Sequence, residues 1–422
     1  MSSALQSGLL FGGPLSLFWG WTICAFFVYP TSGGVYFWIS RLAPSTPALG
    51  FFTGNLYAWA MVLTGCSGNL SVALYLSSMV EIGTGVHLTP VQVAAIAWGI
   101  CILSGIVNIW WTLGGTILLV VTLFVKSAPA GHNSAKFVFT DFENVSGYSN
   151  TGFVVLLGFL QAVYTLEGCE TGAQVAEEAK NAAWAAPVSI SVSIAGSWLL
   201  GVIYLLALLF SVRSIESIAN TSYAIPISQL YVDIMGQRLS LLCLFVIMFA
   251  QWAAALTAWT ASSRLFYALA RDGAFKPRRW FMYLAPTHAP IAGYIGSPIA
   301  FSAIISSAAI SVMIAYLMPL VLRVLRPNCM PERGPFHLGR FSYTCSCLGS
   351  AFGIFVCVLF ILPTYKNVTA QNMNYAIVAV GAVALLVGVQ YLIFRFCGWT
   401  FKGVTRTLEE EQGLQRADAK NV

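Results

Sequence analysis

Long apolar stretches, separated by short polar segments, make up most of the chain. A helix that crosses a bilayer needs about 20 consecutive, mainly apolar residues, and ten stretches reach or approach this length. They cover residues 5–28, 51–80, 91–109, 110–125, 152–174, 187–211, 239–262, 291–322, 343–362 and 375–396. The pattern predicts an all-α fold: a multi-span transmembrane helical bundle over residues 1–396, followed by a mostly polar, cytosolic tail over residues 397–422.

The composition agrees with a chain that lies in the lipid bilayer. Of its 422 residues, 58% are hydrophobic and 9% are charged, whereas soluble globular proteins carry about 25% charged residues. The net charge of +6 comes from basic residues in short blocks between apolar runs, so we expect no nucleic-acid partner. Most of the 10 cysteines lie in apolar runs without metal-ligand spacing, and we expect neither a metal site nor a cofactor.

Basic residues suggest which loops face the cytosol. They are concentrated in residues 263–290, in residues 323–342 and near the C-terminal end. Cytosolic loops carry an excess of Lys and Arg, so we expect all three segments on the cytosolic side. Three Asn-X-Ser/Thr sequons begin at Asn144, Asn220 and Asn367, in loops that fit the opposite side.

This orientation conflicts with the number of spans. Two cytosolic loops need an even number of crossings between them, but only residues 291–322 separate the two most basic loops. Residues 91–125 raise the same difficulty, because the loops on both sides have the character of external loops and 35 residues are too few for two comfortable spans. We therefore expect the chain to lack segments that a complete relative has.

Four motifs stand out along the chain. In order they are Gly12-Gly13-Pro14 with Trp19-Gly20-Trp21, Tyr29-Pro30-Thr31-Ser32-Gly33-Gly34, Tyr164-Thr165-Leu166-Glu167-Gly168-Cys169-Glu170, and Ser262-Ser263-Arg264 with Arg271-Asp272-Gly273. They resemble motifs of the amino acid–polyamine–organocation superfamily of secondary transporters, and most closely those of its fungal-type amino acid, GABA and choline permeases. The resemblance implies a five-plus-five inverted-repeat transporter fold, with about ten spans visible where the family has twelve. It also implies that the chain begins within the first span and has internal gaps.

In transporters of this kind the first and sixth spans are implied to be broken near the membrane midplane, which frees backbone N–H and C=O groups for the substrate. Gly168 lies in the stretch 152–174, which corresponds to the sixth span of the family. It is the candidate for the break in that span, because glycine tolerates an unwound backbone; a close helix contact is the alternative. Ser3 would lie near the break in the first span. Tyr164 aligns with an aromatic residue that covers the substrate, although it could equally be a core or lipid-facing tyrosine.

Two carboxylates lie inside the apolar run of the sixth span. A charge at membrane depth is costly and usually faces a cavity or a partner. Glu170 aligns with an acid of many relatives and could carry a proton, bind an amine or anchor the helix. Glu167 replaces a usually apolar residue, which suggests a cationic or amine-bearing substrate. The alternative is that both carboxylates are merely solvated in an aqueous vestibule.

The candidate residues fall into two groups. Those expected to bind substrate are Ser3, Gly65, Asn69, Tyr164, Thr165, Glu167, Gly168 and Glu170. Those expected to form an inner gate are Glu177, Glu178, Arg264, Arg271 and Asp272. Gly65 and Asn69 lie in the stretch 51–80, which corresponds to the third span of the family. They belong to a helix face made of small and polar residues, and the alternative role of this face is tight packing. The charged group could instead reflect only topology and solvation.

Together these features predict a secondary active permease for an amino acid or a related amine such as GABA or choline. We expect alternating access, proton coupling and a location in the plasma membrane rather than the vacuolar membrane. The chain is not expected to be an enzyme, because its four histidines are scattered and no nucleophilic or phosphate-binding arrangement surrounds them. The alternatives are a non-transporting fragment or mispredicted gene product, or a receptor or channel, although no filter repeat is visible.

Overall fold

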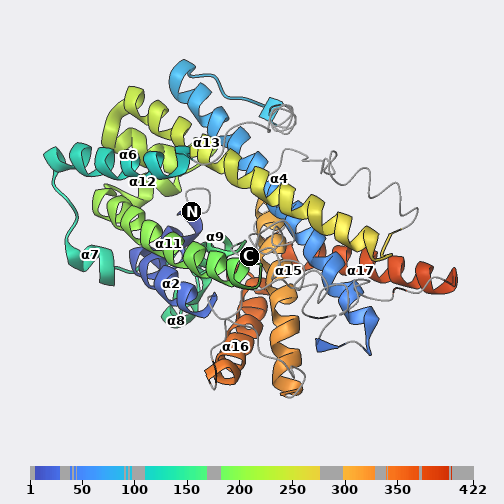
Figure 1. Ribbon diagram of the computed structural model, residues 1–422. Coiled ribbons are helices and arrows are strands. Elements are labelled where there is room, and N and C mark those ends of the chain that lie inside the picture. The colour runs from blue at the N-terminus through green and yellow to red at the C-terminus, as the bar shows by residue number, and fades with distance from the viewer. Residues whose placement is uncertain are drawn as a thin grey trace, which may run out of the picture.

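The computed structural model describes residues 5–28, 39, 42–43, 45–89, 92–93, 96, 110–168, 182–275, 298–327, 339, 341–369, 373–398 and 401. Over these residues the regular structure is helical, apart from one isolated bridge between Phe11 and Asn144 (Figure 1). The helices are α1 (Leu5–Leu10), α2 (Gly13–Val28), α4 (Pro47–Thr84), α6 (Trp110–Ser127), η2 (Ala128–Ala130), α7 (Ala135–Thr140), α8 (Thr151–Leu157), α9 (Leu160–Leu166), α11 (Ala182–Ser211), α12 (Ile215–Ala219), α13 (Ile227–Arg271), α15 (Pro298–Leu325), α16 (Phe341–Ile361) and α17 (Ala376–Phe396).

Six of the described helices are long and apolar enough to cross a membrane, which confirms the predicted helical membrane bundle. Their spans are Pro47–Thr84, Pro187–Ser211, Ile227–Ala270, Ile304–Leu325, Phe341–Ile361 and Ala376–Phe396. The expected stretch over residues 91–109 lies almost wholly outside the described residues. The expected stretch over residues 5–28 is two helices rather than one, because Gly12 and Gly13 both have positive φ, at 96° and 67°, which interrupts a helix.

The longest uninterrupted apolar helix, α4, has local signals at both of its ends. Pro47 occupies its first turn, where the missing proline N–H costs no hydrogen bond. Gly85 ends the helix with a φ of 72°, and its N–H donates to the Glu81 carbonyl at 2.8 Å. This is the left-handed cap that favours glycine.

Helices α4 and α13 cross as the central antiparallel pair of the bundle (Figure 1). Near the start of α4, the rings of Trp59 and Phe266 make an edge contact with centroids 5.8 Å apart. Near its end, the Gln237 amide donates to the Ile82 carbonyl. Residue numbers thus rise along α4 as they fall along α13, so the two helices run in opposite directions.

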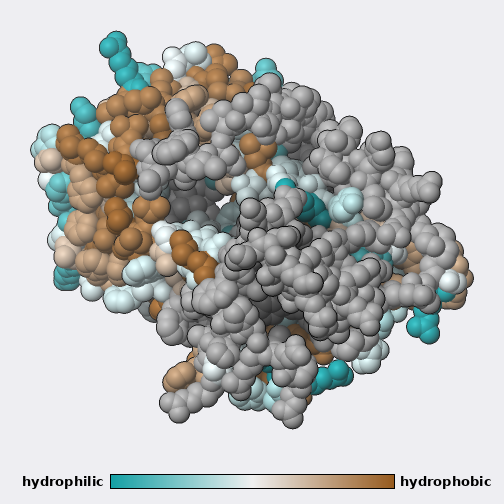
Figure 2. All heavy atoms as spheres, viewed as in Figure 1, coloured by the Kyte–Doolittle hydropathy of each residue, from teal (hydrophilic) through white to brown (hydrophobic). Residues whose placement is uncertain are grey.

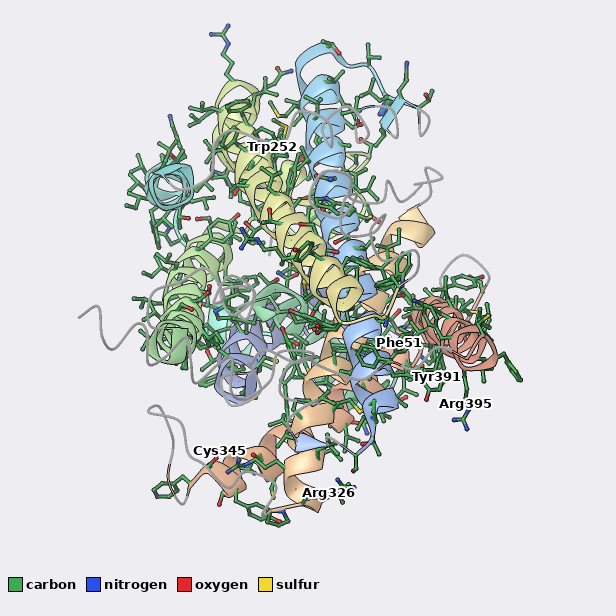
Figure 3. All side chains as sticks on the ribbon, turned by 45° about the vertical axis from the view of Figure 1, so that its right-hand side comes forward. Phe51, Trp252, Arg326, Cys345, Tyr391 and Arg395 are labelled. Atoms are coloured by element: carbon green, nitrogen blue, oxygen red, sulfur yellow. The ribbon has the colours of Figure 1, made fainter. Side chains whose placement is uncertain are left out.

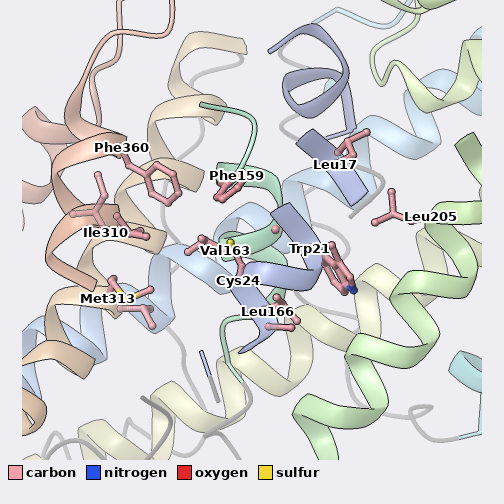
Figure 4. Packing of buried hydrophobic residues seen from close by; sticks show 14 of the residues in the cluster. Leu17, Trp21, Cys24, Phe159, Val163, Leu166, Leu205, Ile310, Met313 and Phe360 are labelled. Atoms are coloured by element: carbon pink, nitrogen blue, oxygen red, sulfur yellow. The ribbon is translucent and has the colours of Figure 1, made fainter. Parts of the chain in front are cut away.

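Helix α2 packs between α9 and α11, and its Trp21 ring lies against α11 (Figure 4). The Trp21 indole N–H donates to the Trp198 carbonyl of α11 at 3.2 Å. A Cβ at Gly201 would lie 2.2 Å from the Trp21 ring, so only glycine leaves room for the indole there. Small residues at such crossings let membrane helices approach closely.

Apolar side chains also cover the outside of the molecule, and Figure 2 shows them gathered over α6 and α11. On α6 the exposed residues include Ile117, Val121 and Val125, and on α11 they include Val192 and Leu199. Exposed apolar faces of this kind suit helices surrounded by lipid.

The loops that carry two of the sequons pack against each other. The Tyr148 hydroxyl donates to the Pro363 carbonyl at 3.1 Å, and the Lys366 N–H donates to the Ser146 carbonyl at 3.0 Å. These contacts place the loops that contain Asn144 and Asn367 on one side of the bundle, as expected from the sequence.

The ends of α13 and α17, which carry basic residues, lie near the start of α4. The Gln390 amide of α17 donates to the Ala274 carbonyl, just after α13, at 3.1 Å. The rings of Phe51 and Tyr391 lie 5.4 Å apart at the start of α4, while Arg395 extends away from them (Figure 3). The C-terminal half of α17 and the end of α13 are thus neighbours, as the orientation expected from the sequence requires. The conflict in the number of crossings involves residues 276–297, which lie outside the described residues.

Cysteine labelling tests this orientation. We expect Ser149→Cys, in the exposed loop between α7 and α8, to react with a membrane-impermeant thiol reagent added to intact cells. Arg326→Cys, exposed just after α15, should react only after the cells are permeabilised, because basic loops are retained in the cytosol. Labelling is measured on purified protein against the unsubstituted chain. Labelling of Arg326→Cys in intact cells would reverse the assignment.

Candidate functional site

The sixth span of the sequence is divided into α8 and α9. The Asn150 side chain caps α8 by accepting from the Phe153 N–H at 3.2 Å. At the junction the Phe159 N–H donates to the Leu156 carbonyl, whereas in a regular α-helix it would donate to the Val155 carbonyl. The Ser16 hydroxyl of α2 donates to the Val155 carbonyl at 2.6 Å, which satisfies the acceptor that this change leaves free.

Helix α9 ends at Leu166, within the apolar stretch that was expected to continue to residue 174. Glu167 is extended, with φ −69° and ψ 158°, and Gly168 has a φ of 88°. The Gly168 N–H donates to the Tyr316 hydroxyl of α15 at 3.4 Å. The helix therefore stops where the sequence places the break, and a left-handed glycine follows. Residues 169–181, including Glu170, Glu177 and Glu178, lie outside the described residues, as does Ser3.

Tyr164 connects α9 to the middle of α4. Its hydroxyl lies 2.6 Å from the Ser67 hydroxyl. Ser67 already donates to the Thr64 carbonyl at 2.8 Å, so Tyr164 is the donor of the bond between the two hydroxyls. The Thr165 hydroxyl donates to the Gln161 carbonyl of its own helix at 2.7 Å, a common arrangement for threonine in membrane helices. Tyr164 is therefore hydrogen-bonded to a second helix, whereas the hydroxyl of Thr165 is hydrogen-bonded within its own helix.

Glu167 lies beside groups from two helices. Its carboxylate interacts electrostatically with the Tyr164 hydroxyl and with the Cys357 thiol of α16. The neighbouring Gly168 contacts Tyr316, whose ring lies 6.3 Å from the ring of Tyr57 on α4. The end of α9 therefore lies near α4, α15 and α16. These three helices supply a serine, two tyrosines and a cysteine.

The structure adds Tyr57, Tyr316 and Cys357 to the candidate site, and the sequence analysis did not identify any of them. Both tyrosines are among the largest fully buried side chains. A buried tyrosine needs a partner for its hydroxyl, so a tyrosine within an apolar stretch was the available signal. That signal is weak, because the chain has 17 tyrosines.

The small-residue face of α4 contacts α13. A Cβ at Gly65 would lie 2.8 Å from the Trp259 ring, and one at Gly68 would lie 2.7 Å from the Ala255 Cβ. These distances favour the packing interpretation for both glycines. Asn69, on the same helix, is 3% exposed, and its role in binding stays a prediction.

The described part of the expected inner gate lies at the end of α13. Arg264 and Arg271 occupy its last turns, and the Asp272 N–H bonds to the Ala268 carbonyl at 2.9 Å as the helix ends. Asp272 is 3% exposed. The structure therefore brings these three residues to one helix end, while their expected partners Glu177 and Glu178 are not described.

Metal ligands do not gather in the described ranges: they contain no group of three or more His, Cys, Asp or Glu side chains that could hold an ion. The hydroxyls that could attract an ion on α13 serve the backbone instead. Thr257 donates to the Ala253 carbonyl at 3.1 Å, and Thr260 donates to the Leu256 carbonyl at 2.9 Å. Ser and Thr hydroxyls in membrane helices commonly bond in this way.

Comparison with known proteins places this arrangement in a family. The amino acid permease profile matches residues 2–384. The GABA-specific permease of Saccharomyces cerevisiae is 27% identical, with 93% of this chain and 78% of the relative aligned. Amino-acid permease BAT1 of Arabidopsis thaliana is 27% identical over 94% of this chain and 88% of the relative. Amino-acid permease 2 of Neurospora crassa is 26% identical over 88% of this chain and 76% of the relative.

The alignment with the yeast permease also bears on the expected internal gaps. It extends over 446 residues, more than the 422 residues of the whole chain, so the relative has residues at positions where this chain has none. The profile nevertheless matches nearly the whole chain, including α4, α8, α9, α13 and α15. The chain therefore belongs to the amino acid permease family, whose members are integral, multi-pass membrane transporters rather than enzymes.

Proposed function

We propose that the protein is a secondary active permease that moves an amino acid, or a related amine such as GABA or choline, by alternating access. The observation that carries this proposal is the end of α9 at Leu166, followed by the left-handed Gly168. Broken helices in transporters present unpaired backbone groups to a substrate. The printed names of the relatives, which include a GABA-specific permease and amino-acid permeases, support this substrate class.

The Gly168 N–H is the group proposed to meet the substrate carboxylate. Its bond to the neutral Tyr316 hydroxyl is long, at 3.4 Å. A carboxylate is a stronger acceptor than a hydroxyl, because charge-assisted hydrogen bonds are shorter and roughly twice as strong as neutral ones. A bound substrate would therefore take this N–H from Tyr316. Ser3, on the first span, is proposed to complete the carboxylate site.

Tyr164 is proposed to cover the bound substrate. The Ser67 hydroxyl holds its ring in place across the gap between α9 and α4. An aromatic face can also attract a substrate amine. Thr165, Gly65 and Asn69 are proposed to line the same pathway. Because Gly65 packs against Trp259, its proposed role is to set the distance between α4 and α13.

Coupling and inner closure are proposed to use the charged residues that follow Gly168 in the sequence, together with those at the end of α13. Glu170, three positions after Glu167, is the proposed proton carrier. Glu177 and Glu178 are proposed to pair with Arg264 and Arg271 when the inner side closes, with Asp272 at the end of α13. Charges that pair in one conformation and separate in the other can hold such a closure.

The function is tested by uptake into cells that lack their own amino acid and GABA permeases. Labelled GABA, choline and neutral and basic amino acids are supplied while surface protein is quantified. A fluorescent fusion shows whether the protein is in the plasma membrane, as proposed, or in the vacuolar membrane. Saturable uptake of at least one substrate is expected. Correctly inserted protein without any uptake would favour the non-transporting alternative, and unsaturable current would favour a channel.

Proton coupling gives a separate expectation. Uptake by the unsubstituted protein should rise as the external pH falls, and Glu170→Gln should remove this dependence, because an amide cannot carry the proton. Glu216→Gln, on an exposed turn of α12, is the matched control and should keep the original pH profile. Initial rates are measured between about pH 5 and pH 8, the range in which maximal stability of most proteins lies. An unchanged profile in Glu170→Gln would exclude Glu170 as the carrier.

A further inference from the structure

Two loops meet on the side of the bundle that carries the sequons. Residues 141–150, the α7–α8 loop, connect α7 to α8, and residues 362–369, the α16 loop, follow α16. The Tyr148 hydroxyl of the first loop lies 3.1 Å from the Pro363 carbonyl and 3.3 Å from the Tyr365 carbonyl of the second. Tyr148 therefore joins the two loops.

The rest of this joint is small and lies at the surface. The Lys366 N–H donates to the Ser146 carbonyl at 3.0 Å, and Gly147 and Lys366 are exposed. One ring contact, between Phe11 of α1 and Tyr365 with centroids 5.2 Å apart, accompanies these bonds. Exposed backbone hydrogen bonds with few apolar contacts belong to the regions that open most easily.

Each loop is also bonded to its own part of the bundle. The N–H groups of Gly12 and Leu15, around the start of α2, donate to carbonyls of the α7–α8 loop at 3.0 and 3.3 Å. The Asn374 amide, just before α17, donates to the last turn of α16 at 2.7 Å and to the Leu362 carbonyl at 3.2 Å. The α7–α8 loop therefore belongs with α1, α2 and α8, and the α16 loop belongs with α16 and α17.

Apolar side chains fill the space between these two parts of the bundle. Phe159 and Val163 of α9 lie in one buried cluster with Phe360 of α16 (Figure 4). Ile310 of α15 belongs to the same cluster. Helix α9 leads from the α8 junction to the break at Gly168, so this cluster lies along the outer half of the broken span.

We propose that the α7–α8 loop and the α16 loop form the outer gate of the permease, which opens to admit a substrate to Gly168 from the external side. This inference rests on the proposed transport function and deepens it. The structure has the gate closed, with the Tyr148 bonds joining the loops above the apolar cluster. Opening separates α8 and α9 from α15 and α16, and the Tyr148 bonds break.

A disulfide across the joint tests this gate. A Cβ at Gly147 would lie 3.6 Å from the Lys366 Cβ, within the range of about 3.5–4.5 Å found in disulfides. In the double variant Gly147→Cys with Lys366→Cys, oxidation should therefore lock the loops together. We expect uptake to fall in proportion to the crosslinked fraction, measured by mass spectrometry, and to return after reduction.

The two single variants are the matched controls for the crosslink. Gly147 has a φ of 78°, so Gly147→Cys alone measures the effect of backbone strain, and Lys366→Cys alone measures the loss of the charge. Both should show the same uptake with and without the oxidant. Full uptake by the crosslinked protein would show that the loops never part, and failure of the disulfide to form would show that they do not meet. Either result overturns the inference.

Removing the Tyr148 hydroxyl tests the gate without a crosslink. Tyr148→Phe keeps the ring contact with Phe153, at 4.9 Å, and loses the bonds to the α16 loop. Cys357, near Glu167, is labelled in intact cells with a membrane-impermeant thiol reagent and quantified by mass spectrometry. Its rate should rise about fivefold, the effect of one net hydrogen bond on an equilibrium. Tyr343→Phe, exposed at the other end of α16, is the matched control and should leave the rate unchanged.

The outcomes separate this inference from the function on which it rests. Exposed Cys397, at the end of α17, is expected on the cytosolic side and should stay unlabelled, which shows that the reagent remains outside. An unchanged Cys357 rate in Tyr148→Phe would overturn the gate while transport itself stands. If the unsubstituted protein transports no substrate, the proposed function falls. Faster labelling of Cys357 in Tyr148→Phe would then still support the opening of the loops, and an unchanged rate would overturn it.

Discussion

Replacing Gly168 by Leu is expected to abolish uptake while the protein remains folded and inserted. Gly168 has a φ of 88°, a region that costs an L-residue roughly 1–2 kcal/mol. A leucine side chain would also stand beside the N–H that faces Tyr316. The strain is small compared with the stability of a large bundle, whereas the blocked N–H removes the proposed carboxylate contact. Initial uptake rates, normalised to surface protein, provide the measurement.

Gly131→Leu is the matched control for backbone strain. Gly131 has a φ of 79°, and a Cβ there would meet nothing within 4 Å. Its loop follows η2, away from the break in the sixth span. We expect this variant to lose stability to a similar degree and to keep its uptake. Normal uptake by Gly168→Leu would remove the main reason for placing the site at the end of α9. A close helix contact would not explain Gly168 either, because a Cβ there would meet nothing within 4 Å.

Replacing Gly65 by Leu is expected to lower the yield of folded protein sharply. The first added carbon would lie 2.8 Å from the Trp259 ring, and three more would follow into the crossing of α4 and α13. Overpacking of a closely packed interior costs about 1–3 kcal/mol and occasionally more. Because α4 and α13 are the central pair of the bundle, separating them disturbs the helices that pack on both. Thermal stability in detergent, followed by size-exclusion chromatography, measures the loss.

Gly83→Leu provides the comparison on the same helix. The nearest atom to a Cβ at Gly83 is the Leu241 Cδ1 at 3.9 Å, an ordinary contact, so its stability should change little. If Gly65→Leu folded normally and lost only uptake, Gly65 would belong to the substrate pathway, as the sequence analysis first suggested. The packing explanation would then be wrong.

The helical spans were predictable because apolar length is a local property. Helices α16 (Phe341–Ile361) and α17 (Ala376–Phe396) agree with the expected stretches 343–362 and 375–396 to within two residues. The junction between α8 and α9 was not predicted. It depends on a hydroxyl from Ser16, which reaches the Val155 carbonyl from 139 positions earlier in the chain. Sequence patterns within one helix contain no information about such a contact.

The candidate site divides in the same way. Tyr164, Glu167 and Gly168 lie within five positions, so a single motif identifies all three, and the end of α9 agrees with the expected break. Tyr316 and Cys357 come from helices more than 140 positions further along the chain, and only folding brings them near Glu167 and Gly168. The ligand roles of all these residues stay predictions, as do those of Ser3, Glu170, Glu177 and Glu178.

The bond between the Tyr164 and Ser67 hydroxyls has a consequence for the resting state of the transporter. If α9 moves against α4 during the cycle, this bond exists in one conformation and is absent in the other. A net hydrogen bond contributes about 1 kcal/mol, which corresponds to about a fivefold ratio between two populations. Ser67 would then bias which side the empty transporter faces. A residue that never touches the substrate would thereby influence its apparent affinity, because only the binding-competent fraction of molecules can accept it.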